Sequence, residues 1–169
     1  KELINKLDKN ENDFESIDGL AFRKDGKTIK TSPRQILKEL DTLPFPAWDL
    51  VNIDNYRDIW LAHNKYFSLN IATTRGCPFK CNWCAKPIYG NRYNCRSAEN
   101  VVQEIEMLIN RYGVEHFWFC DDIFGLKPGW IKQFSELVQQ KNLAFKFKIQ
   151  CRADLLLDSD NIRYLALAG

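Results

Sequence analysis

Apolar residues recur at helical spacing in three segments of the second half of the chain. In residues 97–113, SAENVVQEIEMLINRYG, the repeat of three and four residues predicts an amphipathic helix. Its apolar face would consist of Val101, Ile105, Leu108 and Tyr112. Ser97 is placed to cap this helix and Gly113 to end it. The same spacing predicts a second helix within residues 128–142, and a third helix begins near Asp158.

Three runs rich in β-branched and aromatic residues alternate with these helices. They are YFSLNIATT (66–74), VEHFWFC (114–120) and AFKFKIQCRADLL (144–156). Three strand–helix units in succession predict parallel strands joined by right-handed helical crossovers, in an open α/β sheet or a (β/α) barrel. In the last run, apolar and polar residues alternate: Phe145, Phe147 and Ile149 against Lys146, Lys148, Gln150 and Arg152. The polar set would face either a barrel lumen or solvent at an exposed edge.

The first 65 residues have a different pattern. Residues 17–31 read as a β-hairpin, because Asp25-Gly26 suits the positive φ angles of a tight turn. We expect residues 1–31 to be the tail of a preceding domain. Residues 32–65 contain prolines that break regular structure and read as a linker anchored by Phe45 and Trp48. Residues 66–169 would then form the main α/β domain, and three β/α units without a fourth suggest an excised piece.

Composition and charge restrict the function only broadly. The chain has 169 residues, 45% hydrophobic and 27% charged, which is ordinary for one soluble globular domain. No apolar run approaches the roughly 18 residues of a membrane span. The first ten residues, KELINKLDKN, lack the apolar core of a signal peptide, so we expect a cytoplasmic protein. A net charge of +2 without a basic cluster does not indicate a nucleic-acid partner.

Cysteine spacing is the most informative chemical feature. Of six cysteines, three lie in TTRGCPFKCNWCAKP (73–87) with the spacing Cys-x3-Cys-x2-Cys, and the others are Cys95, Cys120 and Cys151. The chain is long for a disulfide scaffold and lacks an export signal, so the clustering favours a metal.

Three kinds of metal site remain open at this point. A zinc site needs four ligands, with the fourth recruited from Cys95 or a remote residue, and His63 and His116 are too distant in sequence for a local zinc pattern. A ferredoxin-like cluster would also need Cys95 as a fourth ligand. A cubane cluster on three thiolates would instead leave one iron open for chemistry.

The motif and its context resemble a known family. Cys77-x3-Cys81-x2-Cys84, with Trp83 before the last cysteine and a strand ahead of the loop, resembles the radical S-adenosylmethionine (SAM) superfamily. The flanking segments LDTLPFPAWDL, FWFCDDIF and QCRADLL are similar to members that carry an N-terminal cobalamin-binding domain. The resemblance implies that residues 66–169 are the N-terminal half of a TIM-barrel-like partial barrel and that residues 1–31 end the cobalamin domain. The cobalamin-ligating Asp-x-His-x-x-Gly signature is absent from this chain, so cobalamin is implied only for a longer parent protein.

The resemblance also implies an activity and a cofactor site. Cys77, Cys81 and Cys84 would hold a 4Fe–4S cluster whose open iron chelates the amino and carboxylate groups of SAM, and reductive cleavage would yield a 5′-deoxyadenosyl radical. The implied reaction is cobalamin-associated methyl transfer or related C–H functionalisation of a small molecule, with a flavodoxin or ferredoxin as reductant. A methylthiotransferase is the alternative. Those enzymes usually carry three further N-terminal cysteines, and residues 1–65 contain none.

Four further residues are implied as cofactor contacts. Trp83 corresponds to an aromatic position near the adenine. Asp121 or Asp122 stands where many members have Gly-Gly-Glu, and a carboxylate there can accept hydrogen bonds from the methionine ammonium. Arg152 could pair with the methionine carboxylate or form a structural salt bridge. All lie where barrels of this kind bind ligands, at the carboxyl ends of strands. No further catalytic residue is predicted.

Overall fold

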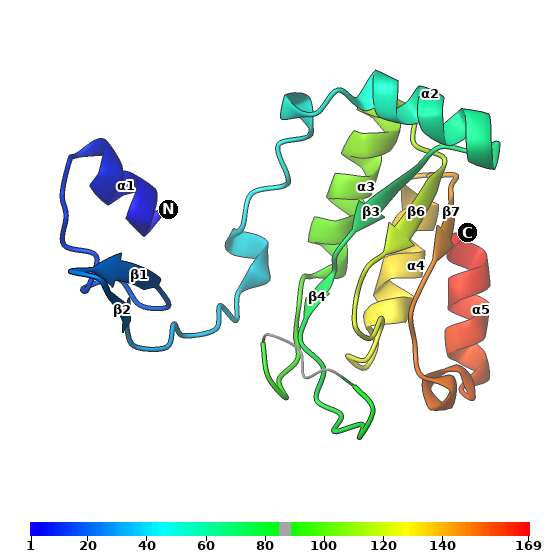
Figure 1. The fold of residues 1–169 in the computed structure, drawn as a ribbon. Helices are drawn as coiled ribbons and strands as arrows, with labels where there is room; N and C mark the ends of the chain where they lie inside the picture. The colour runs from blue at the N-terminus through cyan, green and yellow to red at the C-terminus, as the bar shows by residue number, and fades with distance from the viewer. Residues whose placement is uncertain (85–88) are drawn as a thin grey trace. The chain divides into compact units, whose positions relative to one another are not determined.

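A computed structural model describes residues 1–84 and 89–169 of the chain (Figure 1). The chain divides into two compact units, Lys1–Leu37 and Lys38–Gly169. In the described part, no helix is both long and apolar enough to cross a membrane.

The first unit contains the predicted hairpin. A helix, α1 (Glu2–Asp8), precedes strands β1 (Ala21–Lys24) and β2 (Lys27–Lys30), which pair antiparallel. Asp25 and Gly26 have φ angles of 50° and 74°, the positive values that a two-residue hairpin turn of this hand requires. The hairpin is therefore confirmed. The assignment of residues 1–31 to a preceding domain stays a prediction.

Residues 38–65 hold more structure than a linker pattern predicts. Two short 3₁₀ turns, η1 (Leu40–Thr42) and η2 (Trp48–Leu50), are followed by helix α2 (Ile53–Asn64). The Asn52 side chain caps α2 by accepting a hydrogen bond from the Asn55 backbone N–H at 3.1 Å. Figure 1 shows α2 lying across one end of the sheet of the second unit.

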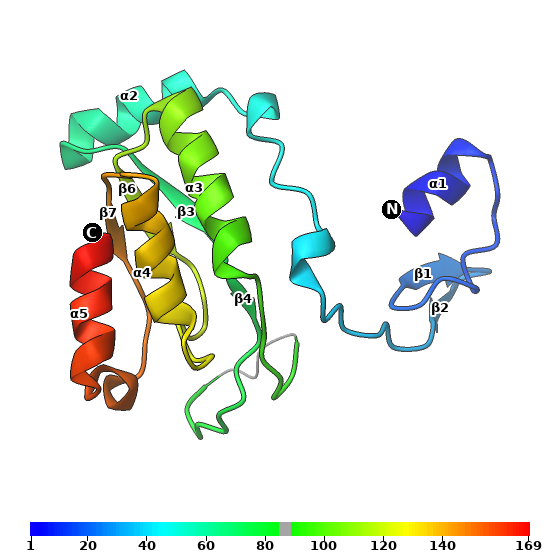
Figure 2. The same cartoon turned by 180° about the vertical axis from the view of Figure 1, so that it is seen from behind.

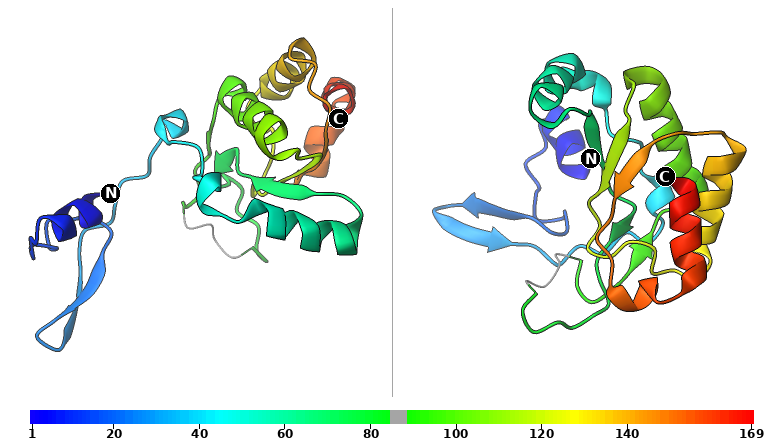
Figure 3. Two further views of the ribbon diagram at one scale, coloured as in Figure 1. Left: turned by 90° about the horizontal axis from the view of Figure 1, so that it is seen from above. Right: turned by 90° about the vertical axis from the view of Figure 1, so that its right-hand side faces the viewer.

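Three parallel strands form the centre of the second unit. They are β3 (Ser68–Ile71), β6 (His116–Phe119) and β7 (Lys146–Lys148), in the order β3-β6-β7. Helices α3 (Ala98–Tyr112), α4 (Trp130–Gln140) and α5 (Ser159–Ala168) alternate with them and cover one face of the sheet (Figures 2 and 3). This confirms the predicted α/β fold with parallel strands. Ser97 caps α3 and Gly113 ends it in the left-handed conformation, both as predicted.

The core lies between the sheet and these helices. On the sheet side it contains Leu69, Ile71, Phe117 and Phe119 from alternate strand positions, together with Phe145 directly before β7. On the helix side it contains Val101, Ile105 and Leu108 of the predicted apolar face of α3, and Ile131, Phe134 and Val138 of α4. On the other face of the sheet, Asn70, Trp118 and Lys148 are exposed and are neighbours in the strand register, whereas Ser68 and His116 at the start of β3 and β6 are buried. Lys146 and Lys148 lie on that exposed face of β7, which is also an edge strand of the three-stranded sheet.

Candidate functional site

The residues singled out from the sequence lie at one end of the sheet. The chain leaves β3 toward the cysteines, leaves β6 at Asp121 and Asp122, and leaves β7 at Arg152, so all three loops follow the carboxyl ends of parallel strands. In Figure 1 these loops lie at the end of the sheet opposite α2. Loops at this end carry the ligand sites of α/β barrels and sheets.

A small antiparallel ladder closes the base of the cysteine segment, residues 76–84. Strands β4 (Thr74–Arg75) and β5 (Asn94–Cys95) pair on either side of it, with Thr74 opposite Cys95. The last three residues of the quoted motif, 85–87, lie outside the described residues. The ladder fixes where the segment begins.

Glycine is the residue type that fits at position 76, directly before Cys77. Its φ is +83°, and a Cβ added there would lie 2.4 Å from the backbone oxygen of Arg92. Any side chain would therefore force the two backbones apart. This close approach, together with the Arg75 guanidinium 5.5 Å from the Tyr89 ring centroid, holds the two sides of the base together.

Asp121 is buried, and both of its carboxylate oxygens accept hydrogen bonds from residues that follow β3. It is 1% exposed. Its Oδ1 accepts hydrogen bonds from the backbone N–H groups of Thr73 at 2.7 Å and Thr74 at 2.8 Å, and its Oδ2 accepts one from the Thr73 hydroxyl at 2.5 Å. Burial raises the pKa of Asp121, and the hydrogen bonds from the two threonines oppose that rise. Asp122, the next residue, is exposed.

Arg152 reaches back over the cysteine segment from the carboxyl end of β7. Its guanidinium carbon lies 4.0 Å from the centroid of the Phe79 ring, and its Nε donates to Asp154 Oδ1 at 2.9 Å. The hydrogen bond from Arg152 to Asp154 is the main cause of the raised pKa of Arg152, and the Asp154 charge and the nearby Cys81 and Cys77 add to it, whereas desolvation opposes the rise. Arg152 lies in the loop that follows β7, and its contact with the methionine carboxylate stays a prediction. Arg152 forms the salt bridge with Asp154 and at the same time lies near Cys81 and Cys77.

The three clustered cysteines share the segment but differ in exposure. Cys77 and Cys81 are half-buried, Cys84 is exposed, and the Trp83 side chain is 88% exposed. The Cys84 N–H donates to the Cys81 carbonyl at 3.3 Å. Within residues 1–84 and 89–169, no group of three or more Cys, His, Asp or Glu side chains is arranged to hold a metal ion.

The donor set nevertheless fits a cubane cluster in its chemistry. Three thiols lie in a segment of eight residues whose base is fixed by the β4–β5 ladder and the close approach at Gly76. Thiolates are the ligands that iron–sulfur clusters take. The Arg152 guanidinium, near Cys81 and Cys77, would supply positive charge beside an anionic cluster held there. Cys77, Cys81 and Cys84 therefore stay the predicted ligands.

The other three cysteines should react slowly with alkylating agents. Burial raises the pKa of Cys95, Cys120 and Cys151, so less thiolate is present at neutral pH than for an ordinary cysteine. Iodoacetamide labelling, followed by peptide mass spectrometry, should be slower at these positions than in an unstructured reference peptide. The deficit should shrink as the pH rises above about 9. Labelling at the reference rate at neutral pH would contradict the shift.

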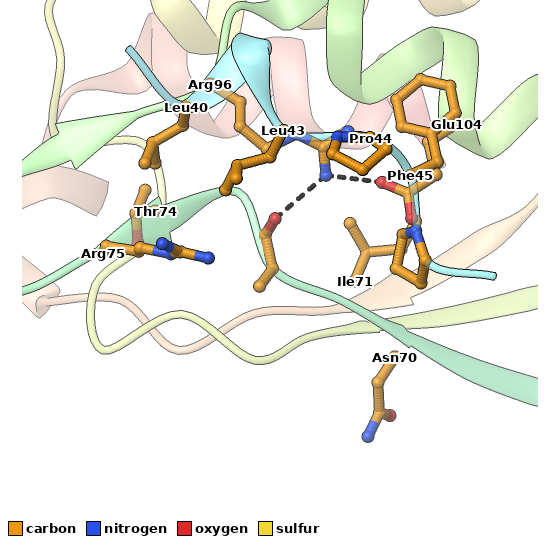
Figure 4. Close-up of a pocket in the computed structure, with 12 residues that line it drawn as sticks. Leu40, Leu43, Pro44, Phe45, Asn70, Ile71, Thr74, Arg75, Arg96 and Glu104 are labelled. Atoms are coloured by element: carbon orange, nitrogen blue, oxygen red, sulfur yellow. Dashed lines mark hydrogen bonds and ion pairs between the residues drawn. The ribbon is translucent and has the colours of Figure 1, made fainter. Parts of the chain in front are cut away.

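A second feature, Arg96, was not predicted from the sequence. It lines a cavity of about 170 Å³ between residues 40–46, here called the proline-rich segment, and the end of β3 (Figure 4). Its guanidinium pairs with Glu104 at 2.5 Å, donates to the Ala72 carbonyl at 3.1 Å, and lies 5.5 Å from the Phe45 ring centroid. Its backbone N–H donates to the Thr73 carbonyl at 2.8 Å. Arg96 therefore connects the proline-rich segment, α3 and the end of β3.

Fold and site together define a class: a parallel (β/α) protein with a three-thiol segment after the first strand of the sheet and charged groups after the next two strands. The chain belongs to the radical SAM superfamily, whose family model matches residues 71–169. Membership in this superfamily implies a 4Fe–4S cluster and SAM as cofactors.

Two relatives resemble nearly the whole chain. An uncharacterized methyltransferase of Pyrococcus horikoshii is 30% identical over 155 residues, covering 91% of this chain and 32% of the relative. The anaerobic magnesium-protoporphyrin IX monomethyl ester cyclase of Synechocystis is 29% identical over 161 residues, covering 95% of this chain and 31% of the relative. The chain thus spans about a third of the length of these relatives.

Solved structures show the same fold. The radical SAM methyltransferase TsrM from Kitasatospora setae, with tryptophan substrate and a SAM analog bound, has a TM-score of 0.74 and 20% identity. This match covers 99% of this chain and 33% of that one. A second structure of TsrM, with cobalamin and a 4Fe–4S cluster bound, has a TM-score of 0.72 and 19% identity over 99% of this chain and 34% of that one. The predicted barrel-like architecture is confirmed by this likeness.

Proposed function

We propose that the protein to which this chain belongs is a cobalamin-associated radical SAM enzyme that carries out methyl transfer or related C–H functionalisation on a small molecule. The observation that carries the proposal is the three-thiol segment at the carboxyl end of β3, in a chain whose residues 71–169 match the superfamily. Cys77, Cys81 and Cys84 would hold the cluster. When bound, the cluster supplies the electron that splits the C5′–S bond of SAM into methionine and a 5′-deoxyadenosyl radical.

Three side chains would bind and orient SAM beside the cluster. Arg152 would pair with the methionine carboxylate, because its guanidinium is held over Phe79 and beside Asp154 while its side chain remains 41% exposed. Asp122 would accept hydrogen bonds from the methionine ammonium, since it is the exposed carboxylate at the end of β6.

The third of these side chains is Trp83. It is 88% exposed and so offers an open aromatic face for the adenine. All three assignments follow the superfamily resemblance and are supported by the place of these residues in loops that follow the carboxyl ends of the parallel strands.

The choice of cobalamin-associated chemistry is supported by the relatives. They include proteins named as methyltransferases and as a cyclase, and the TsrM structure contains both cobalamin and a cluster. This chain lacks the Asp-x-His-x-x-Gly signature, so other parts of the protein would ligate cobalamin. A flavodoxin or ferredoxin would return an electron to the cluster after each cleavage.

The proposed function predicts a direct spectroscopic response to SAM. The purified protein, reconstituted without oxygen, should contain about four irons per chain. Addition of SAM to the reduced protein should change the electron paramagnetic resonance (EPR) spectrum, because SAM would ligate the open iron. Methionine and adenosine, added separately, serve as controls that lack the sulfonium. An intact cluster whose spectrum does not respond to SAM would rule out the proposed enzyme.

A further inference from the structure

We propose that Asp121 is a positioning residue that fixes the start of the cysteine segment, and that it does not contact SAM. This inference rests on the proposed function, because the segment is taken to hold a cluster. Of the two adjacent carboxylates at the end of β6, Asp121 would organise the loop, and Asp122 would be left to contact the ligand.

The position of Asp121 in the sheet explains its contacts. The β3–β6 ladder runs to the pair Ile71–Phe119 and is extended by the Cys120 N–H, which donates to the Ile71 carbonyl at 2.8 Å. Beyond that point the N–H groups of Thr73 and Thr74 have no partner on β6, and buried backbone donors need one. The Asp121 carboxylate accepts from both N–H groups and from the Thr73 hydroxyl.

Burial and occupancy argue against a role in ligand binding. Asp121 is 1% exposed, so a bound molecule could reach it only after Thr73 and Thr74 had moved. Each of its two oxygens already accepts at least one hydrogen bond at 2.8 Å or less. A charged acceptor makes these bonds stronger than neutral ones and therefore more restrictive of the backbone.

The residues that Asp121 holds are the ones that set the direction of the segment. Thr74 belongs to β4, which pairs with β5 at the base, and Gly76 and Cys77 follow at once. From the other side, the Arg96 N–H donates to the Thr73 carbonyl at 2.8 Å. Thr73 is thus fixed through its N–H, its hydroxyl and its carbonyl. Residues that orient metal ligands through a second layer of hydrogen bonds affect metal affinity about 10- to 100-fold.

The test measures how firmly the reconstituted protein keeps its iron. The first variants are Thr73→Val, which keeps the shape but removes the hydroxyl, and Thr73→Ser, which keeps the hydroxyl. Thr73→Val and Asp121→Asn should each increase the rate at which a chelator strips iron by about tenfold or more. Thr73→Ser should retain iron nearly as well as the wild type. The matched control is Asp58→Asn, the same change at an exposed carboxylate on α2, which should not alter iron loss.

A double variant and a binding measurement separate positioning from ligand contact. Both changes remove the same hydrogen bond, which the Thr73 hydroxyl donates to Asp121 Oδ2. The double variant Asp121→Asn with Thr73→Val should therefore lose iron no faster than Asp121→Asn alone. The dissociation constant for SAM, from EPR titration of the fraction that keeps its cluster, should stay within about twofold of wild type, well below the tenfold change that 1.4 kcal/mol produces.

The opposite results would overturn the inference. If Asp121→Asn weakens SAM binding while iron retention is unchanged, Asp121 contacts the ligand. If Asp121→Asn does not fold, as judged by circular dichroism, equal iron loss in Thr73→Val and Thr73→Ser overturns it instead. A stable cluster that the variants do not disturb overturns the positioning role of Asp121 but leaves the proposed function standing. Failure of the wild type to hold any cluster contradicts the proposed function itself.

Discussion

Replacing Cys81 with alanine is expected to abolish the cluster, so that reconstituted protein falls from about four irons per chain to near zero. Cys81 is the central thiol of the motif, and its loss leaves only Cys77 and Cys84 to hold the cluster. Two thiolates cannot hold three irons of a cubane, and the freed corner would be open to solvent. Iron and sulfide analysis, with the visible absorption spectrum, measures the loss.

Cys120→Ala and Cys95→Ala are the controls for this result. Cys120 lies outside the motif at the end of β6, and its replacement should leave the iron content unchanged. Cys95→Ala should also be harmless; loss of the cluster in this variant would identify a four-cysteine, ferredoxin-like site. Zinc without sulfide in the wild type would exclude both cluster interpretations. Wild-type iron in Cys81→Ala would show that the ligand assignment is wrong.

The sequence predicts best those helices whose caps and apolar faces lie within the helical segment itself. In α3, the cap at Ser97, the left-handed Gly113 and the apolar face all lie within one segment of the chain. Helix α2 was missed because it lacks such a face: Ile53 is buried, whereas Tyr56 and Ile59 are exposed. It is held instead by distant contacts, such as Arg57, which donates to the Tyr112 carbonyl. Such contacts become visible only when the fold is known.

Strand boundaries were less predictable than strand order. The run 144–156 reads as one strand, but only Lys146–Lys148 pairs with β6, and Ala153–Leu156 forms a 3₁₀ turn. The residues between them turn over the sheet end, where the Phe124 N–H donates to the Gln150 carbonyl at 2.8 Å. A β-rich composition continues past the point where the partner strand ends, so composition alone does not show where pairing stops.

In the candidate site, too, features within one segment are predictable from the sequence, whereas contacts between distant residues are not. Cys77, Cys81 and Cys84 are predicted as ligands from a motif within one segment and from the family resemblance that the motif carries. The bond from Thr73 to Asp121 joins residues 48 positions apart and depends on the register of β3 with β6. One signal for it was available, because Asp121 continues the alternation of the buried Phe117 and Phe119, which faces the helices.

Breaking the buried ion pair between Arg96 and Glu104, which lines the cavity of Figure 4, should destabilise the second unit. Glu104→Gln is expected to lower the free energy of unfolding by about 3 kcal/mol, within the range for breaking a buried pair. The side chains of Glu104 and Arg96 are only 2% and 12% exposed, so the change leaves the Arg96 charge buried without a carboxylate. Urea denaturation, followed by circular dichroism, measures the change.

Glu106→Gln is the matched control, because it makes the same substitution two residues further along α3. Glu106 pairs with Lys141 at 2.6 Å, nearly the same distance as Glu104 to Arg96, but its side chain is 34% exposed. Exposed pairs contribute about 0–1 kcal/mol, so the two variants should differ by at least about 2 kcal/mol. Equal losses would show that burial does not set the energy here. The bonds from Arg96 to the Ala72 carbonyl and to Asn100 would then suffice to hold the guanidinium without Glu104.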